Sequence, residues 1–161
     1  ICWGMQVAVV AAGGEVKKSS NGSHIGIAFD IELNPNGQRH AIYKGKKNKF
    51  CSPAFNFDEV VTLPDDAVLL ASNNINKISS ISFKHGKSEI WGIQYHPEIK
   101  YEKMIELIKF RKDRLINQRK AFKSYDEIDH HISLIKNELS KSEINHRMIE
   151  LKNWLGSING N

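Results

Sequence analysis

Hydrophobic and polar residues alternate over part of the first half of the chain, with the period that is typical of strands. Between Ile25 and Leu33 every second residue is apolar, so one face of this segment is expected to be buried. Three later apolar stretches, bounded by turn or charged residues, also predict short strands: residues 67–72, 78–83 and 89–95. The sequence KHGK between the last two predicts a tight turn.

Helical spacing lies on both sides of these strands. Residues 3–12 are apolar and compatible with a helix, and Gly13 with Gly14 provides a stop. From about Tyr101 the pattern predicts a long helix whose buried face holds Met104, Ile108, Leu115 and Phe122. The chain is therefore predicted to be an α/β layer followed by a helical tail.

Two further helices are predicted in that tail. Ser124 and Glu127 form a capping-box pair, and the apolar positions after them are Ile128, Ile132, Ile135 and Leu139. A third helix is predicted to begin at Ser142 and to end at Gly156, with an inward face made of Ile144, Met148, Leu151 and Leu155.

The last predicted strand ends at the sequence His96-Pro97-Glu98. Proline cannot donate to a strand ladder, and it biases the preceding residue toward an extended conformation. We therefore expect His96 and Glu98 in a loop at the carboxyl edge of the sheet, where ligands bind in open α/β sheets.

Length and composition predict a folded protein without a membrane segment. The 161 residues are 40% hydrophobic, enough for one domain with a core and a small appended unit. The longest apolar run covers only residues 7–12, and no secretory signal is visible, so we expect a cytoplasmic protein. The chain lacks an initiator methionine and keeps only Ile1 of any strand before Cys2, so we expect an N-terminal truncation.

The net charge of +5 is concentrated in the helical tail, where residues 99–161 hold 13 Lys and Arg against 9 Asp and Glu. The densest run, KFRKDRLINQRKAFK, covers residues 109–123. It falls on a predicted amphipathic helix and lacks aromatic residues at a useful period, so a solvated helix face is favoured over a nucleic-acid site.

The candidate chemistry rests on a cysteine and a histidine. Cys2 and Cys51 are the two cysteines, and no spacing indicates zinc, so free thiols and no metal are expected. Cys2 directly precedes a helix, whose N-terminal dipole favours a thiolate, and Gly4 allows a tight turn. A lone cysteine is more often a buried hydrophobe and a lone His-Pro-Glu more often a surface turn, but together at two strand ends they favour a nucleophile and its base. The remaining histidines are expected to be surface or capping residues: His24, His40, His85, His130, His131 and His146.

The stretches ICWGMQ and GIQYHPE resemble the two signatures of class I (triad-type) glutamine amidotransferases, G-x-C-x-G-x-Q and HPE. The sequences NGSHIGIAFDI and FDEVVTLPDDAVLLASN, and the tail, further resemble stand-alone members close to the amidotransferase domain of GMP synthase. This resemblance implies a three-layer α/β fold with a mostly parallel, flavodoxin-like sheet that is incomplete at the N-terminus. Residues 1–100 are then the C-terminal part of an amidotransferase domain, and residues 101–161 a helical extension.

The resemblance also implies residue roles. Cys2 resembles the nucleophile, His96 its base, and Glu98 the carboxylate that orients the imidazole. Four positions match those that serve the substrate: Trp3 through an oxyanion-hole amide, Gln6 through its side chain, and Ala54 and Phe55 through backbone groups. The first glycine of the signature would precede Ile1, and Asn56 stands where many family members carry a histidine.

The predicted function is hydrolysis of L-glutamine to glutamate and ammonia through a thioester on Cys2. The ammonia would pass to an unknown acceptor, with a synthetase or acceptor domain as partner, and no cofactor is expected. Two alternatives stay open: a γ-glutamyl hydrolase or peptidase of the same superfamily, and a non-catalytic, truncated interaction module that acts through the basic tail.

Overall fold

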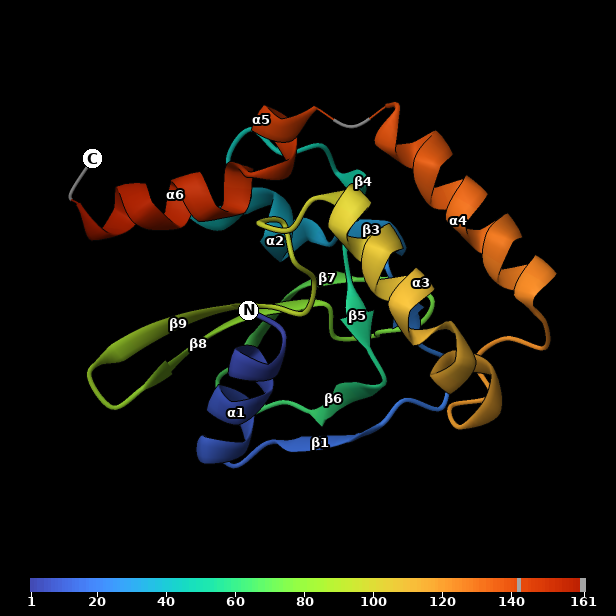
Figure 1. Ribbon diagram of the computed structural model, residues 1–161. Coiled ribbons are helices and arrows are strands. Elements are labelled where there is room, and N and C mark those ends of the chain that lie inside the picture. Colours follow the sequence, from blue (N-terminus) through green and yellow to red (C-terminus); the bar gives the residue numbers. More distant parts are fainter. Residues whose placement is uncertain (142, 160–161) are drawn as a thin grey trace.

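The computed structural model describes residues 1–141 and 143–159, and its centre is a five-stranded sheet (Figure 1). The strand order is β4-β3-β7-β8-β9. The strands, in chain order, are β3 (Ala28–Leu33), β4 (Lys49–Ser52), β7 (Val68–Ser72), β8 (Ser80–His85) and β9 (Ser88–Ile93). Two small ladders lie beside it: β1 (Glu15–Lys18) with β6 (Asp58–Thr62), and β2 (His24–Ile25) with β5 (Phe55–Asn56).

The prediction of a mostly parallel sheet is wrong for the described residues, because every strand pair within them is antiparallel. Parallel neighbours need a crossover of a dozen or more residues, usually through a helix. Here β8 and β9 are joined by a two-residue turn, and only residues 73–79 separate β7 from β8. The short α2 (Pro35–Arg39) and the 3-10 turn η1 (Ala41–Tyr43) lie between the antiparallel partners β3 and β4.

Helix α1 (Trp3–Ala11) confirms the first predicted helix, and it ends at a glycine in the left-handed region, Gly13 with φ 90°. Its buried Met5 and Val9 pack with Ile81 of β8 in one core cluster. Gly92 of β9 is required for this close packing, because a Cβ atom there would lie 2.8 Å from Cγ of Met5. The helix that follows Cys2 is thereby held against the strand that leads to His96.

Helices α3 (Tyr101–Asn117) and α4 (Tyr125–Leu139) form a pair on the other side of the molecule (Figure 1). They share a core cluster with Ile25 and Ile27. The predicted cap of α4 is confirmed, since the Ser124 hydroxyl accepts from the Glu127 amide at 3.2 Å. Helix α3 ends earlier than predicted, so Phe122 packs on this cluster from the connecting loop.

The end of the chain differs most from its prediction. Two short helices, α5 (Ile144–Arg147) and α6 (Ile149–Ile158), replace the expected third helix, and Gly156 lies inside α6 instead of ending it. The expected start, Ser142, lies outside the described residues. The buried residues of these helices are Arg147 and Glu150, not the apolar set that helical spacing indicated. Both form hydrogen bonds with groups in the body of the protein, Arg147 with the Pro97 carbonyl and Glu150 with Lys46.

Candidate active site

Cys2 is the N-cap residue of α1, and its backbone is held in an unusual conformation. Its φ of 48° lies in the left-handed region, which residues other than glycine adopt rarely. Backbone strain of this kind is concentrated at functional sites. Its amide donates to the carbonyl of Ile93 at 2.7 Å, and the Gly4 amide donates to the carbonyl of Ile1 at 2.9 Å. These two bonds fix the tight turn that the sequence predicted and place the cysteine beside the end of β9.

His96 and Glu98 lie in a loop after β9, as predicted. The His96 amide donates to the carbonyl of Pro53 at 2.7 Å, which anchors the loop. The His96 ring donates through Nδ1 to Oε1 of Glu98 at 2.7 Å. Because the carboxylate occupies Nδ1, the second ring nitrogen is left for another partner.

The electrostatics couple His96 to both expected partners. Burial acts to lower its pKa, but the interactions of the ring with Cys2 and Glu98 outweigh burial and raise the pKa of His96 to about 9. Burial acts in the opposite direction on Glu98, and the hydrogen bond from His96 lowers the pKa of that carboxyl below its usual value. These shifts favour a protonated His96 imidazole paired with an ionised Glu98 carboxylate.

Gln94 reaches the cysteine and was not anticipated from the sequence. This buried side chain donates from Nε2 to the Cys2 sulfur at 3.3 Å and accepts at Oε1 from Gln6 at 3.2 Å. Gln6 also donates to the carbonyl of Asp58 at 3.0 Å. One signal in the sequence could have indicated this role: Gln94 is a polar residue in an otherwise apolar strand end, two positions before His96. Residues two positions apart lie on the same face of an extended chain, so Gln94 could be expected on the same side as His96.

The other expected substrate residues differ in position. The side chain of Trp3 is 75% exposed, so its contribution would come from the backbone amide in the first turn of α1. Ala54 is fully buried, and its amide donates to the carbonyl of Gly26 at 3.4 Å. Phe55 belongs to β5 and faces the same pocket as Cys2.

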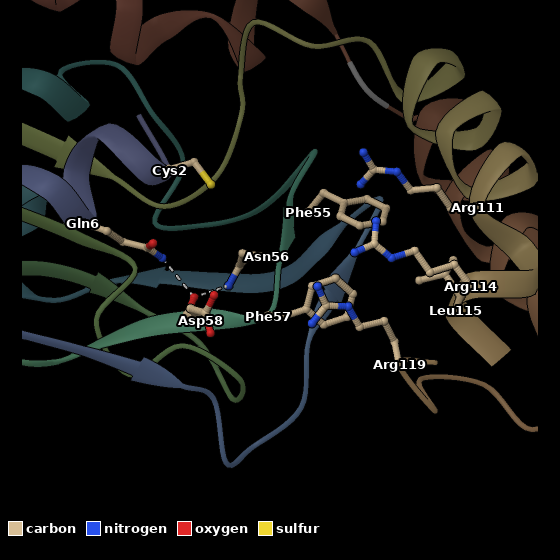
Figure 2. Close-up of a pocket in the computed structure, with 10 residues that line it drawn as sticks. All are labelled: Cys2, Gln6, Phe55, Asn56, Phe57, Asp58, Arg111, Arg114, Leu115 and Arg119. Atoms are coloured by element: carbon tan, nitrogen blue, oxygen red, sulfur yellow. Dashed lines mark hydrogen bonds between the residues drawn. The ribbon is translucent and has the colours of Figure 1, made fainter. Parts of the chain in front are cut away.

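A cavity of about 220 Å³ opens beside Cys2 (Figure 2). Its lining residues are Cys2, Gln6, Phe55, Asn56, Phe57, Asp58, Arg111, Arg114, Leu115 and Arg119. It brings together three of the seven expected site residues, namely Cys2, Gln6 and Phe55, while the others lie outside its lining. One wall comes from α3 and the residues after it, which no pattern in the sequence had connected with the site.

The family model of the class-I glutamine amidotransferases matches residues 1–112 of this sequence. The chain belongs to this family. The predicted resemblance is thereby confirmed, and it extends to the amidotransferase subunits of GMP synthase.

Two relatives of this amidotransferase chain show how much of it is shared. It is 43% identical over 102 residues to a gamma-glutamyl-L-1-hydroxyisopropylamide hydrolase from a Pseudomonas species, which covers 62% of this chain and 34% of that protein. It is 32% identical over 108 residues to the glutamine-hydrolyzing GMP synthase subunit from Methanococcus vannielii, covering 67% of this chain and 53% of that protein. The chain therefore spans between a third and about half of the length of these relatives.

The α/β fold also matches solved structures of the family. A glutamine amidotransferase from Thermotoga maritima superposes with a TM-score of 0.64 at 18% identity, over 97% of this chain and 59% of that one. At this identity the likeness shows a shared fold.

His24 is a buried residue, so its prediction as a surface or capping histidine is wrong. It is 3% exposed; its Nδ1 donates to Oδ1 of Asn56 at 3.0 Å, and its Nε2 accepts from Nδ2 of Asn73 at 2.9 Å. Burial lowers its pKa, and one neutral tautomer satisfies both partners. His24 thus fixes the orientation of Asn56, a residue that lines the pocket beside Cys2. By contrast, His40 does cap a helix, since its ring accepts from the Ile42 amide at 3.2 Å.

Two kinds of feature are absent from residues 1–141 and 143–159. Within those ranges, no group of three or more His, Cys, Asp or Glu side chains is arranged to hold a metal ion. No helix there combines the length and apolar character needed to cross a bilayer.

Proposed function

We propose that this chain carries the glutaminase site of a cysteine-dependent amidotransferase, which hydrolyses L-glutamine to glutamate and ammonia. Cys2 acts as the nucleophile, His96 as its base, and Glu98 as the carboxylate that orients the imidazole. The observation that supports this proposal best is the 2.7 Å hydrogen bond between His96 and Glu98, together with the pKa of about 9 that the ring takes beside Cys2.

The reaction proceeds in two steps. The Cys2 sulfur attacks the γ-carbonyl carbon of glutamine while His96 holds the thiol proton; the C–N bond breaks, and His96 gives that proton to the departing ammonia. A γ-glutamyl thioester on Cys2 remains. His96 then takes a proton from water, whose oxygen attacks the thioester, so that glutamate leaves and the sulfur is restored.

The surrounding residues serve the acyl group. The Trp3 amide, in the first turn of α1, donates to the oxyanion that forms at the γ-carbonyl. Gln6 holds the substrate glutamine by its side chain, and the backbone of Ala54 and Phe55 contacts it from the β5 side. Gln94 donates to the Cys2 sulfur and so favours the thiolate.

The released ammonia passes to an acceptor that a synthetase subunit or acceptor domain supplies. In this proposal residues 1–100 carry the catalytic groups, while residues 101–161 form a helical extension that completes the pocket. The two free thiols fit a reducing compartment, so we also propose a cytoplasmic location.

A second function is favoured by the 43% identical relative, which is named as a hydrolase of a γ-glutamyl amide. The chemistry at Cys2 would be the same, but the amine that leaves would be larger than ammonia and would be released to solvent. This alternative needs no acceptor partner.

The test is covalent labelling of the full-length protein with a diazo-ketone analogue of glutamine, followed by mass spectrometry of the peptides. Labelling is expected at Cys2, and it should disappear with excess glutamine and in His96→Ala. Cys51→Ala is the matched control, because Cys51 is half-buried and burial raises the pKa of its thiol. A folded protein that takes no label at Cys2 would rule out this proposal and favour the non-catalytic interaction module.

A further inference from the structure

Three arginines form one wall of the Cys2 pocket. Arg111 and Arg114 lie on α3, and Arg119 follows shortly after its end. Figure 2 shows all three side chains extending from this segment toward Phe55 and Phe57, with Cys2 and Gln6 at the opposite side of the pocket. We call Arg111, Arg114 and Arg119 the arginine wall. The basic run that the sequence suggested to be a solvated helix face therefore borders the candidate active site.

These guanidinium groups have no carboxylate partner among the residues that the structure describes. Across the described part of the chain, residues 1–141 and 143–159, none of the three takes part in a side-chain hydrogen bond or an ion pair. Arg111 lies over the Phe55 ring at 5.4 Å and Arg119 over the Phe57 ring at 4.6 Å. A guanidinium stacked on an aromatic face keeps its N–H edge free, so these contacts orient two of the arginines without using their donors.

The charge of the pocket is one-sided. Asp58 is the acidic residue of its lining, against three arginines. The two charged residues between Arg111 and Arg114 are engaged elsewhere: Lys112 lies over the Tyr125 ring at 5.2 Å, and Asp113 accepts from the Tyr125 hydroxyl at 2.6 Å. Three like charges within nine residues repel one another, and a bound anion would relieve that repulsion.

We propose that the arginine wall binds a carboxylate on the amine side of a γ-glutamyl amide, so that the substrates of this site include γ-glutamyl amino acids. This inference rests on the thioester chemistry proposed above and extends it beyond glutamine. The Gln6 and Cys2 end of the pocket takes the γ-glutamyl part, which leaves the arginine wall for the group beyond the scissile bond. Guanidinium groups match carboxylates in planar, paired hydrogen bonds, which favours such a group over a neutral amine.

Arg114 is the best residue for a test, because it is exposed and lies outside both stacked pairs. The full-length wild-type protein, Arg114→Gln and the matched control Lys112→Gln are assayed for kcat/KM with γ-glutamyl-glycine and with γ-glutamyl-ethylamide. These substrates share the scissile bond and differ in the carboxylate. Arg114→Gln is expected to lower kcat/KM for γ-glutamyl-glycine by about tenfold or more, which is the effect of a lost charge-assisted hydrogen bond. For the ethylamide, which has no carboxylate, the expected loss in kcat/KM is less than about threefold. Lys112→Gln is expected to change neither.

The outcomes separate this inference from the proposed function. Equal losses on both substrates would overturn the inference, because the arginine would then bind the shared γ-glutamyl part. No loss on either substrate would also overturn it, and an acidic surface of a partner would become the next occupant to test. If wild type hydrolyses glutamine and neither larger amide, the inference fails while the proposed function stands. If Cys2 takes no label and no amide is hydrolysed, both fail.

Discussion

Arg147 of α5 donates from Nε to the carbonyl of Pro97 at 3.2 Å, although the two residues lie fifty positions apart. Pro97 stands between His96 and Glu98, so the bond fixes the loop that carries both. The arginine is buried, which strengthens its dependence on this partner. The C-terminal helices thus contact the backbone of the candidate active site directly.

Replacing Arg147 should therefore loosen the His96–Glu98 pair without touching the substrate. Arg147→Met is expected to lower kcat for glutamine by about tenfold, with a much smaller change in KM, since the loss of a hydrogen bond from a charged group is of this size. The pKa of His96, followed by NMR of its ring, should fall from about 9 toward its ordinary value. A variant that loses stability but keeps both the pKa and kcat would show that Arg147 serves folding alone.

The buried ion pair between Lys46 and Glu150 leads to a second prediction, on the free energy of unfolding. Their side chains are each 1% exposed and 2.9 Å apart, and Tyr95 donates its hydroxyl to the same carboxylate at 2.8 Å. Lys46→Met and Glu150→Gln should each cost about 3–5 kcal/mol of unfolding free energy, because each leaves a buried group without its partner. The double variant Lys46→Met/Glu150→Gln should cost clearly less than the sum of the two single losses. Denaturant titration measures all of them, and additive losses would contradict the coupling.

The pKa of His96 predicts how stability depends on pH. Below about pH 6.5 the ring is protonated in both the folded and the unfolded chain, and its stabilising contribution is complete. As the pH rises from there through about 9 the contribution is lost, because the unfolded chain gives up its proton first. The difference in unfolding free energy between wild type and His96→Gln should thus be largest near pH 6 and shrink by pH 9.5. The exposed His85, replaced by glutamine, serves as control, and a pH-independent difference would contradict the prediction.

Gln94 should matter for the reactivity of the cysteine. Gln94→Leu keeps a similar volume but removes the donor that lies 3.3 Å from the Cys2 sulfur. The rate of Cys2 labelling by the diazo-ketone analogue should fall by about tenfold or more, as expected for a lost hydrogen bond to a charged group. Asn74→Leu, a polar residue of the loop after β7, is the comparison for a generic loss of polarity. An unchanged labelling rate in Gln94→Leu would show that the contact does not act on the thiolate.

Local signals predicted several turns and element starts correctly, although α3 ends before Phe122 and Gly156 does not end its helix. Cys2 was expected at a helix start because an apolar helix follows it, and His96 in a loop because proline follows it; both expectations match the structure. The Ser124 cap was also readable, because its hydrogen bond joins residues only three positions apart. Such features depend only on residues that are close in the sequence, so a single sequence is enough to predict them.

Features that depend on distant partners were missed. Arg147 and Glu150 occupy the inward face of the last helices because they form hydrogen bonds with Pro97 and Lys46. Helical periodicity could not predict this, because it assigns charged residues to the solvent-exposed face. His24 is buried for the same reason, since Asn56 and Asn73 satisfy its ring from other strands and loops. The antiparallel sheet was missed because the family resemblance implied a mostly parallel one, while the short connections between strands pointed the other way.

The family match ends at residue 112, but the carboxylate that neutralises Lys46 comes from residue 150. A fragment cut at the end of the match would lose the carboxylate and the two backbone carbonyls that bind the Lys46 ammonium group, and it would uncover the apolar side chains beneath α4. The last two helices therefore belong to the unit that must fold here, and the Thermotoga maritima structure superposes over 97% of this chain, well beyond the matched residues. Transplanting this site into another protein would require the last two helices to travel with it.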